Sequence, residues 1–236
     1  VKCLVVLNMM PNAFDDQYIG CADKMDNDAS ELLEKEKSWN NRLKNVWDHS
    51  KTKWASVKPK LSLPTNFKDE YGRAIVAYTN STPLDNVVFS TEFNQAVRGN
   101  GTSQAHYMAK FHFKAFHYYL TRALQLLRGK CDQMVYRGVP DEYKHTEGFI
   151  RFGQFASSSL DEQEAKKFAE KGPSGASTVF TIHTCFGVDI SEFSYNPNQK
   201  EVLIPIHEIF TEDKDNIFVL RSTKQTCNHF NCAYLG

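Results

Sequence analysis

Three polar interruptions of apolar segments bring together residue types that can do chemistry. Arg137 ends the run MVYR, three serines (157–159) follow FGQFA, and Glu201 opens the run EVLIP. A guanidinium is a planar fork that binds phosphate or carboxylate, and a carboxylate beside an apolar surface can stabilise a developing positive charge. Each feature alone also has a structural explanation: a solvated charge, a helix cap, and a charge that blocks strand pairing. Only their combination and order favour a catalytic site.

The overall composition is that of an ordinary globular protein. Of the 236 residues, 41% are hydrophobic and 24% are charged, and Lys+Arg and Asp+Glu both number 28. Without net positive charge the chain lacks the field that attracts nucleic acid or an anionic membrane. No apolar run approaches the ~20 residues of a membrane-spanning helix. The N-terminal VKCLVVLN is too short for a signal peptide and predicts a strand.

The six cysteines favour disulfide bonds over a metal site. None forms a Cys-x-x-Cys pair, and the one metal-like grouping, Cys227, His229 and Cys232, matches no standard zinc spacing. We therefore expect no metal. An even number of widely spaced cysteines is typical of an oxidising compartment, and Asn80 and Asn100 each begin an N-glycosylation triplet. These features predict a secreted or cell-surface glycoprotein.

Helical periodicity occupies the first half of the chain and strand patterns occupy the second. Apolar spacing predicts helices over 29–57, 74–78, 92–98 and 111–128. Runs rich in β-branched and aromatic residues predict strands over 134–139, 149–159, 178–188, 201–210 and 216–223, interrupted by one helix over 160–171. This segregation predicts the α+β class. We expect one domain over 1–236, with a helical part (about 1–130) packed on a mixed β-sheet sandwich (131–236).

The ordered set Arg137, Phe155-x-Ser157-x-Ser159 and Gln199-x-Glu201 resembles the signature of the ADP-ribosyltransferase superfamily. Other segments resemble the vertebrate arginine-specific ecto-ADP-ribosyltransferases, in the same order along nearly the whole chain: NAFDDQYIGC (12–21), AYTNS (77–81), FHFKAFHYYLTRALQLL (111–127), TCFGV (184–188) and NCAYL (231–235). The resemblance implies that family's fold and an extracellular enzyme that consumes NAD as a substrate. No Gly-x-Gly-x-x-Gly occurs, so a Rossmann crevice is not expected.

The resemblance also implies a role for each site residue. Cleavage of the nicotinamide–ribose bond develops positive charge on the ribose, which Glu201 would stabilise while Ser157 braces its carboxylate. The planar fork of Arg137 would bind the phosphate–ribose region of NAD. The backbone of Gly138 would hold nicotinamide, because glycine permits close approach. Further NAD contacts are implied for Tyr78, Gln154, Phe168 and Ser194, with a core position as the alternative for Phe168.

The disulfide pairing comes from the resemblance, because six cysteines allow many connectivities. The family would pair Cys21 with Cys232, which ties the N-terminal segment to the C-terminus. It would also pair Cys131 with Cys185 inside the strand-rich half. The remaining two cysteines lie near the chain ends joined by the first bridge, and we expect a third bridge between Cys3 and Cys227.

Gln199 departs from the arginine-specific pattern, which has glutamate two residues before the catalytic glutamate. That acid would orient or deprotonate the acceptor guanidinium, which is a poor nucleophile while protonated. An amide carries no charge and cannot act as a base. We therefore expect NAD hydrolysis to persist with Glu201 and transfer to arginine to be weak, or directed to another acceptor. The preceding residues would face the acceptor, with Tyr195 as an exposed contact or the anchor of a solvated turn.

Alternative functions remain open on the sequence. An active NAD-consuming ecto-enzyme, transferase or hydrolase, explains why Arg137, Ser157 and Glu201 are all present. A weak or inactive binding module at the cell surface would not need them, and a disulfide-rich structural ectodomain leaves their order without a reason. For the enzyme the partners are NAD and extracellular or secretory-pathway proteins with acceptor arginines. We expect a monomer that is secreted or held at the cell surface, with a GPI anchor in the full-length precursor.

Overall fold

The computed structural model describes residues 4–145, 147–170 and 176–236. Its chain forms two compact units. We call the first the β unit (Val1–Met10, Arg128–Ser191 and Asn198–Cys227) and the second the helical unit (Pro11–Leu127, Glu192–Pro197 and Asn228–Gly236). The change at Arg128 lies near the predicted division at residue 130. Short segments from both ends and from 192–197 nevertheless cross that division, because they pack against elements distant in the sequence.

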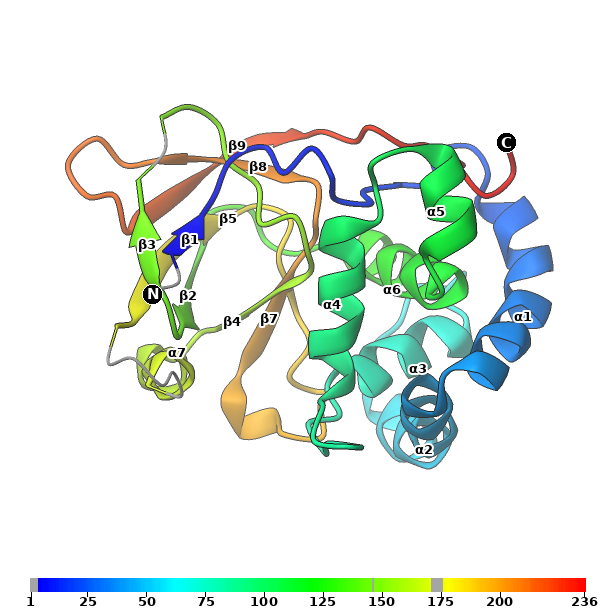
Figure 1. Cartoon of the computed structure of the whole chain (residues 1–236). Coiled ribbons are helices and arrows are strands. Elements are labelled where there is room, and N and C mark those ends of the chain that lie inside the picture. The colour runs from blue at the N-terminus through cyan, green and yellow to red at the C-terminus, as the bar shows by residue number, and fades with distance from the viewer. Residues whose placement is uncertain (1–3, 146, 171–175) are drawn as a thin grey trace. The chain divides into compact units, whose positions relative to one another are not determined.

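Six α-helices and one short 3-10 helix build the helical unit (Figure 1): α1 Ala22–Trp39, α2 Asn41–Val57, η1 Lys58–Lys60, α3 Asp69–Tyr78, α4 Phe89–Gly99, α5 Gln104–Lys110 and α6 Lys114–Leu127. Helix α6 is buried along most of its length, and α1 and α3 both pack against it. Its Phe116 ring packs edge-on against Phe89 and Phe93 of α4, with centroids 4.9 and 5.0 Å away. Burial of these large aromatic rings stabilises the unit.

The helix predictions in this unit were wrong at their boundaries. Those over 74–78 and 92–98 are too short, because α3 begins at Asp69 and α4 begins at Phe89. The helix predicted over 29–57 is two helices, because Asn40 adopts an extended conformation and its side chain accepts a hydrogen bond from the Leu43 amide as the N-cap of α2. The helix predicted from residue 111 begins at Lys114 instead. There the buried Glu36 carboxylate of α1 accepts hydrogen bonds from the Lys114 and Ala115 amides, at 2.6 and 2.8 Å. A side chain from a distant helix thus satisfies the first amides of α6.

The β unit contains a mixed seven-stranded sheet in the order β6-β7-β4-β2-β5-β9-β8, and a parallel pair of β1 and β3. The strands are β1 Leu4–Val6, β2 Gln133–Val139, β3 Glu142–Lys144, β4 Ala156–Ser159, β5 Thr178–Thr184, β6 Val188–Asp189, β7 Glu201–Ile204, β8 Glu208–Glu212 and β9 Val219–Thr226. Only β5 and β9 pair in parallel within the large sheet, as far as the described residues go. Helix α7, Glu162–Ala169, packs against β2, and the 3-10 helix η2, Pro197–Gln199, precedes β7. The α+β class is confirmed.

Three predicted strands are shorter in the structure. The run 149–159 is a strand only from Ala156, although Ile150 forms an isolated bridge with Phe210. The run 178–188 turns between β5 and β6, and the run 201–210 divides between β7 and β8. Pro205 follows β7 directly and has no amide hydrogen to continue the ladder. The part of the predicted helix 160–171 that reaches residue 171 lies outside the described residues.

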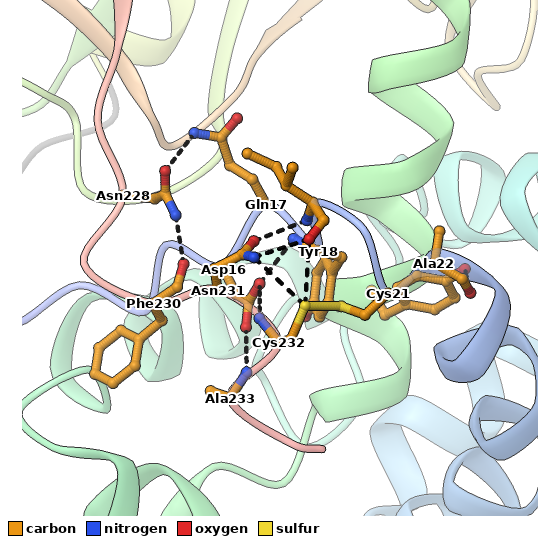
Figure 2. Close-up of a disulfide and its surroundings, with 12 residues drawn as sticks. Asp16, Gln17, Tyr18, Cys21, Ala22, Asn228, Phe230, Asn231, Cys232 and Ala233 are labelled. Carbon is orange, nitrogen blue, oxygen red and sulfur yellow. Dashed lines mark hydrogen bonds between the residues drawn. A yellow bond between two sulfur atoms is a disulfide. The ribbon is translucent and has the colours of Figure 1, made fainter. Parts of the chain in front are cut away.

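Two disulfides join segments that are distant in the sequence. Cys21 and Cys232, 211 residues apart, are bonded in the helical unit (Figure 2), and Cys131 and Cys185 are bonded in the β unit. The structure thus contains both bridges that the resemblance implies. Cys3 lies outside the described residues, so its bridge to Cys227 stays a prediction.

The grouping of Cys227, His229 and Cys232 does not form a metal site. Cys232 is in a disulfide, and the His229 Nδ1 atom lies 3.0 Å from the buried carboxylate of Asp15. Within 4–145, 147–170 and 176–236, no three His, Cys, Asp or Glu side chains are placed to hold a metal ion. None of the helices in these ranges is long and apolar enough to cross a membrane.

Candidate active site

The pairing of β4 with β7 brings the serine run beside Glu201. Ser159 lies opposite Glu201 and Ser157 lies opposite Leu203 in this antiparallel ladder. Alternate residues of a strand share a face, so Ser157, Ser159 and Glu201 lie on the same face of the sheet. The Ser157 hydroxyl donates a hydrogen bond to the Glu201 carboxylate. The β-sheet register therefore sets the spacing of this pair.

The Glu201 carboxylate is held in a poorly hydrated position. Desolvation by burial raises the pKa of Glu201 from 4.5 to about 6, against the opposing effects of the Ser157 hydrogen bond and the Arg137 charge. The carboxylate is therefore mostly ionised at neutral pH, although its charge is poorly solvated. A carboxylate in this state interacts strongly with positive charge, because little water screens it.

Arg137 on β2 completes a group of three. Its Nη1 atom donates a 2.7 Å hydrogen bond to the Ser157 carbonyl, and its guanidinium lies over the Phe152 ring, 5.6 Å from the centroid. The charge of Arg137 also acts on Glu201. The β unit thus brings together Arg137, Ser157 and Glu201, although 64 positions separate the first from the last in the sequence.

The structure gives a reason for glycine at Gly138, the residue after Arg137. A Cβ atom there would lie 1.8 Å from the Ala165 carbonyl oxygen and 2.9 Å from the Ala169 amide nitrogen of α7. Helix α7 therefore packs directly on the backbone of β2. The role of this backbone in holding nicotinamide stays a prediction.

Two further predicted NAD contacts lie in the β unit. Gln154 is buried and follows Gly153, whose φ of +69° directs the chain into β4. Phe168 on α7 is 41% exposed, whereas Ala165 and Ala169 form the buried face of that helix. The alternative for Phe168, a core position, is therefore wrong, and the ring is accessible to a ligand.

The remaining predicted contacts belong to the helical unit. Tyr78 is buried, and its hydroxyl accepts a 2.9 Å hydrogen bond from the Asn94 amide. Ser194 is also buried, and its hydroxyl accepts from the Asn196 amide. These contacts hold both side chains in place, and their contact with NAD stays a prediction.

Of the two roles expected for Tyr195, an exposed contact or the anchor of its turn, the structure contradicts the first. It is half-buried, and its hydroxyl is buried with no hydrogen-bond partner in the described part of the chain. The Lys53 ammonium lies 5.7 Å from the centroid of the Tyr195 ring. The backbone amide of Tyr195 donates a hydrogen bond to the Thr79 hydroxyl. Tyr195 therefore anchors the 192–197 segment to α2 and to the end of α3.

The two predicted glycosylation sites have half-buried side chains in the helical unit. The Asn80 side-chain oxygen Oδ1 accepts a 3.0 Å hydrogen bond from the Thr82 backbone amide. The side-chain nitrogen Nδ2 of Asn100 donates to the Ala96 carbonyl at 2.7 Å. The side-chain oxygen of Asn100 lies 2.9 Å from Nε2 of His106. Modification at both sites stays a prediction.

Sequence reasoning missed two residues that support the site. Phe152 lies under the Arg137 guanidinium, and Lys200, between Gln199 and Glu201, has a φ of +47°. A lysine gives no sequence signal for a left-handed conformation, which glycine and asparagine favour. The one available signal for Phe152 was its aromatic side chain at the start of FGQFA, the run that precedes the serines.

Comparison with known proteins identifies the family. A model of the family NAD:arginine ADP-ribosyltransferase matches residues 7–228. The chain is 43% identical to rat ecto-ADP-ribosyltransferase 5, over 99% of this chain and 77% of that protein. It is also 43% identical to rat T-cell ecto-ADP-ribosyltransferase 2, over 98% of this chain and 80% of the relative.

Solved structures give the same result. The crystal structure of the eukaryotic mono-ADP-ribosyltransferase ART2.2 matches with a TM-score of 0.84 and 41% identity, over 98% of this chain and 99% of that one. A variant of ART2.2 solved in complex with NAD matches with a TM-score of 0.81 and 40% identity, over the same shares. The chain belongs to the NAD:arginine ADP-ribosyltransferase family.

Proposed function

We propose that this protein is an NAD-consuming ADP-ribosyltransferase whose main reaction is hydrolysis of NAD to ADP-ribose and nicotinamide. The observation that carries the proposal is the grouping of Arg137, Ser157 and Glu201 on neighbouring strands, with a Glu201 pKa raised to about 6. A desolvated carboxylate with a perturbed pKa beside a cationic fork is typical of a functional site. Membership of the family supports the same conclusion.

The side chains of the β unit fit the chemistry of NAD. The Arg137 guanidinium offers donors to a phosphate or ribose oxygen, and the half-buried Glu201 offers a negative charge beneath a sugar. Phe168 offers an accessible ring to an aromatic base. NAD itself supplies the ADP-ribosyl group and nicotinamide as the leaving group. Gln154 and the backbone of Gly138, in the same unit, would contribute further contacts.

Within this set each residue has a separate task. Glu201 stabilises the positive charge that develops on the ribose as the bond to nicotinamide lengthens. Ser157 holds the Glu201 carboxylate through its hydroxyl, and its own carbonyl holds Arg137. Because both contacts run through Ser157, this residue couples the groups that bind NAD to the group that acts on it.

Gln199 directs the reaction away from arginine. The residue precedes the Glu201 strand at the end of η2 and is half-buried. The side-chain amide of Gln199 can accept a hydrogen bond from a guanidinium but cannot remove a proton from the guanidinium. Water needs less activation than a protonated guanidinium when the ribose carries positive charge. Transfer to arginine would therefore be slow, and an acceptor other than arginine remains compatible with the amide.

The setting of the enzyme follows from its relatives. The relatives named above are ecto-enzymes, and two disulfides are typical of an oxidising compartment. We place this protein outside the cell or at its surface, with protein acceptors there and a GPI anchor in the precursor. The family match spans segments of both units, which supports one catalytic domain. We propose that this domain acts as a monomer.

The experiment that tests this function measures NAD consumption by the protein and by Glu201→Gln. We expect NAD hydrolysis by the unmodified chain and a loss of about 10²–10³-fold in the variant, as for removal of one charge-stabilising group. Glu162→Gln, an exposed position on α7, is the matched control and should retain activity. NAD binding without turnover in the unmodified chain would favour the binding module instead.

A further inference from the structure

Each of the three consecutive serines of β4 contacts a different part of the segment that carries Glu201. Ser157 bonds to the Glu201 carboxylate. The hydroxyl of Ser158 donates to the Val202 carbonyl at 2.7 Å, and that of Ser159 donates to the Gln199 carbonyl at 2.7 Å. The last two are buried. Three hydroxyls of β4 therefore hold the Glu201 side chain, the backbone of β7 and the turn before β7, respectively.

Ser159 belongs to a connection that the sequence indicates only as a helix start. Its hydroxyl also accepts a 2.9 Å hydrogen bond from the Asp161 amide. The amide of Leu160, which lies between these two residues, donates to the Lys200 carbonyl at 3.1 Å. The junction between β4 and α7 thus bonds to two consecutive carbonyls, those of Gln199 and Lys200. Both carbonyls precede Glu201 directly.

Lys200 shows why this turn needs external support. Its φ of +47° lies in the left-handed region, which is unfavourable for a residue with a Cβ. Its ammonium points to Asp161, 3.6 Å from Oδ2, and this carboxylate also caps α7 by accepting from the Gln163 amide. The exposed ion pair adds little. The hydrogen bonds from Ser159 and Leu160 are therefore the main contacts that hold Lys200 in this conformation.

We infer that Ser159 is a positioning residue for the acceptor position, Gln199, and does not take part in NAD cleavage. Its hydroxyl fixes the backbone of Gln199 and, through the strained Lys200, the angle between residue 199 and Glu201. Ser157 acts on the NAD-cleaving carboxylate, whereas Ser159 acts on the residue that meets the nucleophile. The serine run thus divides between the two half-reactions. This assignment rests on the proposed function of Glu201 and Gln199.

The first test measures backbone hydrogen exchange and NAD hydrolysis in Ser159→Ala, Ser158→Ala and Ser159→Thr. We expect Ser159→Ala to raise amide exchange over 198–200 about fivefold, the factor for one lost hydrogen bond. Its NAD hydrolysis should stay within about twofold of the unmodified chain. Ser158→Ala, the matched control on the same strand, should leave exchange over 198–200 unchanged. Ser159→Thr keeps the hydroxyl and should restore the original exchange.

Two results would overturn the inference. One is unchanged exchange over 198–200 in Ser159→Ala. The other is a loss of NAD hydrolysis as large as that of Ser157→Ala, which would place Ser159 in the cleavage machinery. Hydrogen exchange needs no turnover, so an unmodified chain that fails to hydrolyse NAD would contradict the proposed function and leave the exchange result valid.

A second readout separates positioning from a purely structural role. In the Gln199→Glu background, Ser159→Ala should lower the ratio of agmatine transfer to NAD hydrolysis about fivefold. Ser158→Ala in the same background should leave that ratio unchanged. Equal ratios for the two alanine variants would mean that Ser159 only stabilises the fold.

Discussion

At the scale of single residues, the balance of forces on Glu201 predicts the pH dependence of the reaction. Desolvation raises its pKa to about 6, and the reaction needs the ionised carboxylate. The rate of NAD hydrolysis should therefore rise with pH, reach half its plateau near pH 6 and level off above it. A profile of kcat/KM, which reports the groups of the free enzyme, measured between pH 5 and 8 tests this. A plateau already reached at pH 5 would contradict the proposed role.

The same balance predicts the effect of Ser157→Ala on this profile. The Ser157 hydrogen bond lowers the Glu201 pKa by favouring the charged form. Its removal should move the midpoint of the kcat/KM profile to higher pH, besides lowering the plateau. A lower plateau with an unmoved midpoint would mean that Ser157 acts on NAD alone. The midpoint of Ser158→Ala should stay in place, since Ser158 bonds to the Val202 carbonyl.

The residues of the site could be predicted to different degrees. Arg137, Ser157 and Glu201 could be identified because their types and order resemble a family signature. The half-burial of Tyr195 and the left-handed Lys200 could not. Both depend on contacts with distant segments: Thr79 and Lys53 for the first, and the β4–α7 junction for the second.

At the scale of elements, the direct packing of α7 on β2 predicts a large effect for Gly138→Ala. The added Cβ would meet the Ala165 carbonyl at 1.8 Å, so the helix must move. We expect a loss of about 2–3 kcal/mol in the free energy of unfolding, typical of overpacking, measured by urea denaturation. Gly99→Ala is the control, since nothing lies within 4 Å of its added Cβ. Equal midpoints for the two variants would contradict this packing.

Element types followed from sequence periodicity, whereas several element ends did not. The helix break at Asn40 has a local cause, an N-cap side chain, and could have been read from its residue type. The start of α6 could not, because its cap is Glu36, 78 residues earlier in the chain. The ends of β5 and β7 depend on the turn at Cys185 and on Pro205.

At the scale of the whole molecule, the C-terminal segment is held by a disulfide and by carboxylates. Asp15 accepts hydrogen bonds from the His229 and Phe230 backbone amides. Asp16 accepts from the Cys232 and Ala233 backbone amides (Figure 2). The double variant Cys21→Ala/Cys232→Ala should lose about 2–5 kcal/mol, because the bridge closes a long loop in the unfolded chain. Urea denaturation under oxidising conditions measures this loss.

The contacts of Asp15 and Asp16 provide a control for the double variant. Because Asp15 and Asp16 still bond to the C-terminal backbone, the double variant should keep NAD hydrolysis at temperatures where it stays folded. An unchanged denaturation midpoint would contradict the stabilising role of the bridge. Loss of hydrolysis in a fully folded double variant would show that the bridge also shapes the site.

Glu201 supports cleavage of NAD, whereas Gln199 withholds transfer to arginine. The most direct measurement incubates the protein and Gln199→Glu with NAD labelled in the adenosine part, with and without agmatine, and separates the products. We expect free ADP-ribose with little agmatine adduct from the unmodified chain, and abundant agmatine adduct from Gln199→Glu. Abundant adduct from the unmodified chain would contradict the account, because another group would then have to activate the guanidinium.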